Sequence, residues 1–283
     1  MLRPMEETLV PRVTALIVSR DCETELRQCL ESLEASKQRI RLEILVVDDG
    51  SQDGTPDVPS EFPDVITLRL PKRLGTTRST NIGLRTAKGE LILLLPPTYR
   101  VGPETVQILA TRLEANADVG AVCPSIPQAW SFPTPASLQL AWKTGDLPGA
   151  VSIEGSGEHS VEYPQGSPML VRRDLLRAMH FLDERFGDRW ADLELCSRIR
   201  GGGKSILVLS DVNVSGAVAP EKELTELEWT DSANGVATWI GLHGGSMAGV
   251  LARMSMAFYA LGRGKTGVFT GILSGSKIDG NQD

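Results

Sequence analysis

Acidic and polar side chains stand directly after two short apolar runs near the start of the chain. Ser19 and Asp21 follow the first run, and Asp48 and Asp49 follow the second. A carboxylate in such a place can accept hydrogen bonds from a bound ligand, or it can cap the turn in which it lies. Ligands of open α/β sheets bind at the carboxyl ends of the strands, so we expect a ligand site at these turns.

The turns belong to an alternation of strand and helix patterns. Apolar runs typical of buried parallel strands fall at residues 13–18, 42–47, 65–70, 91–95 and 120–123. Apolar residues at helical spacing fall at residues 23–33, 76–87 and 103–115. This alternation predicts an α/β fold with a mostly parallel sheet, flanked by helices and joined by right-handed crossovers.

The second half of the chain is less regular. Residues 124–166 are rich in Pro, Gly, Ser and Trp and predict a long surface excursion, with short strands as an alternative within it. Strand patterns return at residues 169–172 and 205–209, and helix patterns at residues 174–179, 193–200 and from 221 onward. We therefore expect one domain over residues 1–220 and a helical extension over residues 221–283 packed on it, with a loose tail from about residue 275.

Several motifs occur in an order that resembles family 2 glycosyltransferases, which are inverting enzymes with the GT-A fold. Residues 45–55 (LVVDDGSQDGT) are similar almost letter for letter to that family's most recognisable motif, and residues 190–198 (WADLELCSR) resemble its catalytic-base segment. The resemblance covers roughly residues 13–216. It implies transfer from a nucleoside diphosphate sugar to an acceptor hydroxyl.

The resemblance also implies a nucleotide-binding group near the first three strand ends. Its expected members are Ser19, Asp21, Asp48, Asp49, Arg73 and Arg78. The four residues at the first two strand ends would surround the base and ribose, and the two arginines would contact the pyrophosphate. For the arginines, solvated surface charge is the equally weighted alternative.

Asp192 matches the position of the family's general base. On the acceptor side, the resemblance implies Trp190, Glu194 and Arg173. The family usually has a second acid directly before the base, but this chain has Ala191 there. Asp192 would also stabilise the N-terminus of the helix that follows it, so the two roles are compatible.

The metal-binding carboxylate of the family is missing from this sequence. The turn after the fourth strand reads Pro96-Pro97-Thr98, and residues 210–216 contain no histidine. Divalent cations need oxygen ligands, usually including carboxylates, so the sequence argues against a Mg²⁺ or Mn²⁺ cofactor. A basic side chain would then offset the charge of the leaving diphosphate. The candidates are Arg73, Arg78, Arg100 and Lys204.

Two functional hypotheses follow. The first is a metal-independent glycosyltransferase of cell-surface polysaccharide or glycan synthesis, which uses a UDP-, GDP- or dTDP-sugar and a glycan or lipid-linked acceptor. The second is a catalytically inactive protein of the same fold that serves as a binding or scaffold partner. A nucleotidyltransferase fits less well, because no Gly-rich loop with Lys and Arg follows the first strand.

The bulk composition narrows the partners and the compartment. A net charge of −7 and a pI of about 5.2 argue against nucleic-acid binding. Four cysteines without a C-x-x-C pair are typical of free thiols in a reducing compartment. Residues 1–10 do not resemble a signal peptide. We therefore expect a cytoplasmic protein.

The C-terminal segment carries apolar residues broken by a few basic ones. Residues 247–273 contain Arg253, Arg263 and Lys265. A basic amphipathic helix lying on the inner face of the membrane is one interpretation. A helix packed on the domain, or in a homodimer contact, is the interpretation that the glycines at 262 and 264 favour.

Overall fold

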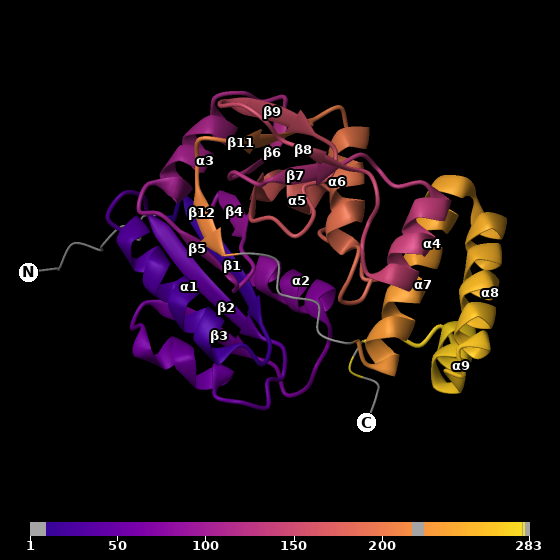
Figure 1. The fold of residues 1–283 in the computed structure, drawn as a ribbon. Helices are drawn as coiled ribbons and strands as arrows, with labels where there is room; N and C mark the ends of the chain where they lie inside the picture. Colours follow the sequence, from indigo (N-terminus) through magenta and orange to yellow (C-terminus); the bar gives the residue numbers. More distant parts are fainter. Residues whose placement is uncertain (1–9, 217–223, 279, 281–283) are drawn as a thin grey trace, which may run out of the picture.

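The computed structural model describes residues 10–216, 224–278 and 280, and it is built around one twisted eight-stranded sheet (Figure 1). The strand order is β3-β2-β1-β4-β10-β6-β11-β9. These strands are β1 (Val13–Ser19), β2 (Leu42–Asp48), β3 (Val65–Arg69), β4 (Leu91–Leu94), β6 (Val119–Cys123), β9 (Glu158–Val161), β10 (Met169–Arg172) and β11 (Ser205–Leu209). Two further pairs are β5 (Tyr99–Val101) with β12 (Val214–Gly216), and β7 (Gln128–Trp130) with β8 (Ala150–Ser152).

Strand direction changes in the middle of the sheet. β1 pairs in parallel with both β2 and β4, and β2 pairs in parallel with β3. β10 then lies antiparallel between β4 and β6, and β9 lies antiparallel beside β11. The sheet is therefore mixed but mostly parallel, and the prediction of an α/β fold with a mostly parallel sheet is confirmed.

Alternate residues of the strands feed two hydrophobic cores. In β1, Val13, Ala15 and Ile17 belong to the core that also holds side chains of α1 (Glu23–Ser36) and α3 (Thr105–Glu114). Leu16 points to the other core, with side chains of α2 (Thr76–Thr86) and α6 (Ala191–Gly201). Both faces of β1 are buried, as its continuous apolar run predicts.

The remaining helices complete these layers. They are the 3-10 helix η1 (Thr55–Glu61), α4 (Pro135–Thr144), α5 (Arg173–Ala178), α7 (Glu226–Gly244), α8 (Ser246–Gly262) and α9 (Thr266–Ser274). α4, α7, α8 and α9 gather beside the sheet in Figure 1, with α8 and α9 farthest from it. Among the described residues, none of the helices is long and apolar enough to cross a membrane.

Helix α2 packs directly against side chains of the sheet at Gly83. A Cβ placed on Gly83 would come within 2.3 Å of Leu16 Cδ1 and 3.0 Å of Val47 Cγ2, so a larger residue there would push the helix away. Asn81 fixes the same helix laterally: its side-chain amide donates to the Leu182 carbonyl (2.9 Å), and its side-chain oxygen accepts from the Leu182 N–H (3.0 Å). The first turn of α2 is thereby held in a fixed place.

The irregular segment 124–166 contains short strands, and also a helix and a sheet-edge strand that its composition does not predict. It holds β7, α4 and β8, and its last strand, β9, forms one edge of the main sheet. The helical C-terminal part is confirmed by α7, α8 and α9. The expected boundary at residue 220 lies outside the described residues. Within the expected loose tail, Ile278 is buried, and its N–H donates to Asp231 Oδ1 (3.0 Å).

Candidate functional site

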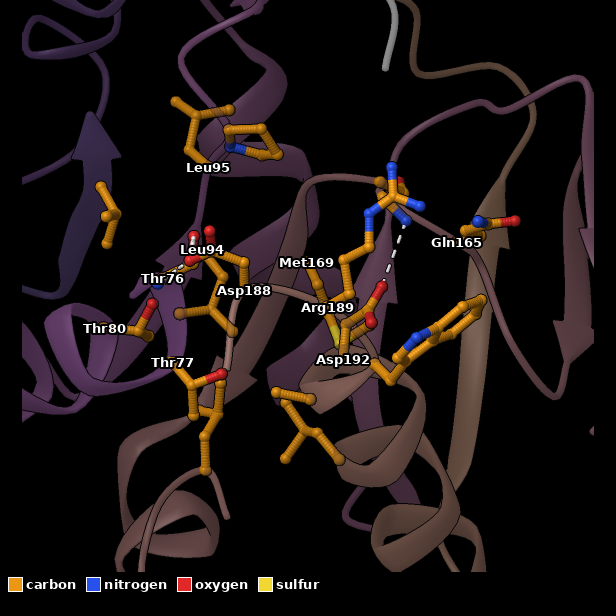
Figure 2. A pocket seen from close by; sticks show the side chains of 18 of the residues that line it. Thr76, Thr77, Thr80, Leu94, Leu95, Gln165, Met169, Asp188, Arg189 and Asp192 are labelled. Carbon is orange, nitrogen blue, oxygen red and sulfur yellow. Dashed lines mark hydrogen bonds between the residues drawn. The ribbon is translucent and has the colours of Figure 1, made fainter. Parts of the chain in front are cut away.

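A cavity of about 460 Å³ opens beyond the carboxyl ends of β1 and β4 (Figure 2). Val18 of β1 and Leu94 of β4 form part of its wall, next to Pro96 and Pro97. The first turns of α2 contribute Thr76, Thr77 and Thr80, and the opposite wall comes from residues 163–169 and 182–195. The cavity therefore lies where open α/β sheets bind their ligands.

Asp192, the expected general base, lies in the wall of this cavity. Its Oδ2 accepts hydrogen bonds from the Tyr163 hydroxyl (2.9 Å) and from the Gly166 N–H (3.4 Å). Its Oδ1 accepts from the Leu193 N–H (2.9 Å) in the first turn of α6. Burial and the Asp192 charge hold the pKa of Tyr163 well above its ordinary value, so Tyr163 stays protonated and keeps donating to the carboxylate.

Arg189 brings a positive charge into the same cavity. It is the one basic residue among the described residues that line the wall. Figure 2 shows Arg189 and Asp192 pointing toward one another. The site thus places a fixed cation beside a carboxylate in a partly enclosed space, where charges interact more strongly than in open water.

The turn that separates these two residues has an uncommon backbone conformation. Trp190 has φ of 74° and lies at the N-cap of α6. A bulky residue rarely adopts positive φ, so the surrounding contacts must hold it there. The Trp190 indole N–H donates to the Ser232 hydroxyl (3.0 Å) of α7, and its side chain is buried in the cavity wall. The tryptophan thereby fixes where Arg189 and Asp192 project.

Two acids, Asp188 and Asp231, connect the cavity wall to neighbouring segments of the chain. Asp188 accepts from the Thr76 N–H (2.7 Å) at the start of α2, and it also pairs with Arg73. Asp231, buried in α7, accepts from the backbone N–H groups of Asp188 (2.9 Å) and Ile278 (3.0 Å). Residues from three distant parts of the chain are joined through these two carboxylates, which makes the segment before α6 rigid.

Because Asp231 is buried, its ionisation should change how the free energy of unfolding depends on pH. Burial raises the pKa of Asp231 from 3.8 to about 6. The folded chain then holds this proton between about pH 4 and 6 while the unfolded chain loses it, so the contribution of Asp231 to the free energy of unfolding falls as pH rises through this window. Urea unfolding at pH 4.5 and 7.5 measures how much the free energy of unfolding decreases between the two pH values. In Asp231→Asn this decrease should be smaller than in the native chain by about 1–3 kcal/mol. Parallel pH curves for the two proteins would contradict this.

The two aspartates of the LVVDDGS motif are buried and do not line the cavity. Asp48 Oδ2 accepts from the Ser51 N–H (3.2 Å), which closes the turn after β2. Asp49 accepts from the Leu74 N–H (2.7 Å) and the Ser79 hydroxyl (2.8 Å), among others. Asp49 thus holds the start of α2, whose threonines line the cavity. A contact of either aspartate with a nucleotide stays a prediction.

The other expected nucleotide-binding residues surround the same turns. Ser19 is fully buried, and its hydroxyl has no hydrogen-bond partner among the described residues. Asp21 is exposed and accepts from the Gln52 N–H (2.7 Å). Arg73 pairs with Asp188 and, at 2.9 Å, with Glu228 of α7. Arg78 is 3.5 Å from Glu184. Their roles toward a nucleotide stay predictions.

On the expected acceptor side, the structure brings only Trp190 to the cavity. Glu194 is buried and pairs with Arg198 (2.7 Å), and burial raises the pKa of this carboxyl. Arg173 donates to the Ala87 carbonyl (2.9 Å). Neither Glu194 nor Arg173 lines the cavity, so both contribute contacts within the fold, and an acceptor role for either stays a prediction.

Two carboxylates among the described residues that line the cavity, Asp188 and Asp192, are the candidate ligands for a divalent cation. The loop from Leu95 to Thr98 supplies carbonyls and one hydroxyl, whereas Mg²⁺ and Mn²⁺ usually take carboxylates. Asp188 and Asp192 already accept several hydrogen bonds each. Within the part of the chain that the structure describes, no group of three or more His, Cys, Asp or Glu could hold a metal ion.

Arg189, the basic residue that lines the cavity, is not among the cations predicted from the sequence. Arg73, Arg78, Arg100 and Lys204 were the expected candidates, and none of them lines the cavity. Arg189 does, and the signal that could have found it is its place in the sequence, directly before Trp190 and three residues before the expected base. Asp188 and the threonines of α2 were also missed, because their approach to the cavity depends on tertiary packing.

The sequence and the fold define the class of protein. The model of glycosyl transferase family 2 matches residues 14–179, which is more than half of the chain, and the chain belongs to this family. EpsH of Bacillus subtilis (strain 168), named as a glycosyltransferase, is 31% identical over 99 residues, which span 33% of this chain and 28% of EpsH. The succinoglycan biosynthesis protein ExoO of Rhizobium meliloti (strain 1021) is 29% identical over 108 residues, which span 38% of this chain and 31% of ExoO. The match thus spans about a third of each relative.

Solved structures confirm the GT-A fold. GalNAc-T7 with UDP, GalNAc and Mn²⁺ superposes with a TM-score of 0.60 at 14% identity, covering 80% of this chain and 48% of that one. Residues 1–349 of S. aureus TarS superpose with a TM-score of 0.57 at 16% identity, covering 93% and 71%. TarS with UDP-GlcNAc gives 0.55 at 17% identity, covering 81% and 66%.

Proposed function

We propose that the chain transfers a sugar from a nucleoside diphosphate sugar to an acceptor hydroxyl, with inversion, and that the cavity holds the reacting groups. The observation that carries this proposal is the Asp192 carboxylate in the cavity wall, oriented by Tyr163 and Gly166 and facing Arg189. Family membership supports the same chemistry.

Asp192 would act as the general base. The acceptor oxygen forms a bond to the anomeric carbon from one side while the bond to the diphosphate oxygen breaks on the other, and the acceptor proton passes to Asp192. Tyr163 and Gly166 occupy Oδ2 with their hydrogen bonds, which fixes the plane of the carboxylate. Holding the base in one geometry contributes to the rate, because the reacting atoms of the two substrates must be aligned.

Arg189 would offset the negative charge that grows on the leaving diphosphate. A preorganised cation in a partly enclosed site stabilises developing charge without reorganising at the moment of reaction. No step of the proposed reaction runs through a metal ion, because the described residues include no group of three or more His, Cys, Asp or Glu that could hold one. This assignment replaces the four cations expected from the sequence with one that faces the cavity.

We propose cell-surface polysaccharide synthesis as the setting and a glycan or lipid-linked molecule as the acceptor. The likeness to ExoO, a succinoglycan biosynthesis protein, supports the setting. The structures of TarS with UDP-GlcNAc and of GalNAc-T7 with UDP support a UDP-linked donor over GDP or dTDP.

Calorimetric titration with UDP, GDP and dTDP tests the donor pocket and its metal dependence together. Each nucleotide is titrated in EDTA and again in excess Mn²⁺. We expect UDP to bind in the micromolar range, about −8 kcal/mol, with the same affinity in both buffers. A screen of the corresponding sugar nucleotides for release of the nucleoside diphosphate then follows.

Two other results of the titration would contradict the proposal in part or in full. Binding that requires Mn²⁺ would contradict the metal-independent mechanism and leave the glycosyltransferase assignment standing. Binding of no nucleotide under either condition, and no release of nucleoside diphosphate with any acceptor, would favour a catalytically inactive scaffold of the same fold.

A further inference from the structure

Helix α8 carries a continuous apolar stripe that the described residues leave largely exposed. The stripe consists of Met247, Val250, Leu251, Met254, Phe258 and Leu261, which are 69%, 55%, 63%, 37%, 57% and 42% exposed. Their spacing of 3, 4, 7, 11 and 14 residues from the first member places them within about 100° of the helix circumference. Exposed apolar side chains are common singly, but a contiguous face of this kind marks an interaction site.

The opposite face of α8 is built to pack tightly. Gly249, Ala252, Ala257 and Ala260 are buried against the rest of the helical layer. A Cβ on Gly249 would lie 2.8 Å from the Ala237 carbonyl oxygen of α7, so the two helices approach as closely as their backbones allow. This contact fixes the rotation of α8, and the stripe must therefore face outward.

The charge around the stripe is opposite in sign to that of the whole chain. Residues 241–278 contain Arg253, Arg263, Lys265 and Lys277 and no acidic residue, whereas the chain has a net charge of −7. Arg263 and Lys265 are exposed just beyond the end of the stripe. The acidic group that faces them from a neighbouring helix is Glu226 of α7, 4.0 Å from the Lys265 ammonium. The surface combines an apolar face with local positive charge.

We propose that this outer face of α8 lies on a lipid surface that contains anionic headgroups. Apolar side chains would enter the boundary between headgroups and acyl chains, and the basic residues would lie among the headgroups. A second copy of the chain fits less well. In a two-fold contact the stripe would meet itself, and residues 241–278 of the second copy would bring no acidic residue to Arg263 and Lys265.

Vesicle flotation tests this surface. The native chain is mixed with vesicles of phosphatidylcholine alone or with phosphatidylcholine containing phosphatidylglycerol, at low and high ionic strength. We expect binding to the anionic vesicles, weakened by salt, and little binding to the neutral ones. The double substitution Met247→Gln with Leu251→Gln should weaken binding to anionic vesicles by about tenfold or more.

A matched control separates this effect from a general change in surface polarity. Leu140 and Val151 are 47% and 62% exposed and lie on α4 and β8, outside the stripe. Leu140→Gln with Val151→Gln should leave vesicle binding unchanged, and thermal unfolding should show that both double variants fold. A third double substitution, Arg263→Gln with Lys265→Gln, removes two positive charges beside the stripe. It should reduce binding to anionic vesicles and make that binding less dependent on salt.

Three results would overturn the proposal. The native chain could fail to bind anionic vesicles at low ionic strength. The stripe and control variants could bind equally well. Light scattering could show a native dimer that the stripe variant converts to a monomer, in which case the face is a contact between copies. Nucleotide titration of the same variants is a separate readout, so failure here leaves the proposed function untouched.

Discussion

Replacing Asp192 with asparagine is expected to lower the turnover number for sugar transfer by about 10²–10⁴-fold, because the acceptor proton loses its base. The side chain keeps its shape, and its remaining oxygen can still accept from Tyr163. The affinity for the nucleoside diphosphate should therefore stay within a few-fold of the native value. Steady-state kinetics with the donor found by the nucleotide screen, together with calorimetry, measures both quantities.

Asp174 provides a matched control for that substitution. Like Asp192, Asp174 lies in the first turn of a helix and accepts from the N–H of the next residue, at 2.7 Å compared with 2.9 Å. Asp174 is exposed and does not line the cavity. Asp174→Asn should leave turnover unchanged while repeating the loss of charge at a helix N-terminus. Native turnover in Asp192→Asn would remove the residue from the mechanism.

Arg189→Gln is expected to lower the turnover number by about 10²–10³-fold, because the charge on the leaving diphosphate loses its stabilising cation. The affinity for the nucleoside diphosphate should also fall, whereas Asp192→Asn leaves it nearly unchanged. The two variants are therefore distinguishable by calorimetry alone. Adding Mn²⁺ should not restore Arg189→Gln, since no group of three or more His, Cys, Asp or Glu among the described residues could hold the ion.

The control for Arg189 is its near neighbour Arg185. Arg185 is exposed, pairs with Asp183 at 2.6 Å and does not line the cavity. Arg185→Gln removes the same charge from the same segment and should keep native kinetics. If the two arginine variants lose turnover equally, the effect belongs to the net charge of the segment and the role proposed for Arg189 is wrong.

The central strands could be predicted from the sequence because both of their faces are buried. The run over residues 13–18, for example, is apolar except for Thr14, so the pattern needs no tertiary information. The pairs β5 with β12 and β7 with β8 were not foreseen. Each of these strands has three residues, and the partners of the first pair lie far apart in sequence. Such pairings form because the surrounding fold brings the segments together.

Part of the candidate site could also be predicted from the sequence, through a local motif. Asp192 and Trp190 follow a recognisable motif, and both lie at the cavity. The contribution of Arg189 depends on the positive φ of Trp190, which is fixed by contacts with α7. Asp49 is buried and accepts from backbone N–H groups of the loop before α2, and its contact with a nucleotide stays a prediction. Local sequence does not distinguish a carboxylate that binds a ligand from one that holds a loop.

The placement of β10 has a consequence for the nascent chain. One edge of β4 is covered only by β10, which begins roughly 75 residues later. At a synthesis rate of about 5–20 residues per second, this apolar edge waits roughly 4–15 s for its partner. An unpaired apolar strand edge is a template for pairing with other chains. Chaperone binding during synthesis would therefore matter most while residues 95–168 are emerging from the ribosome.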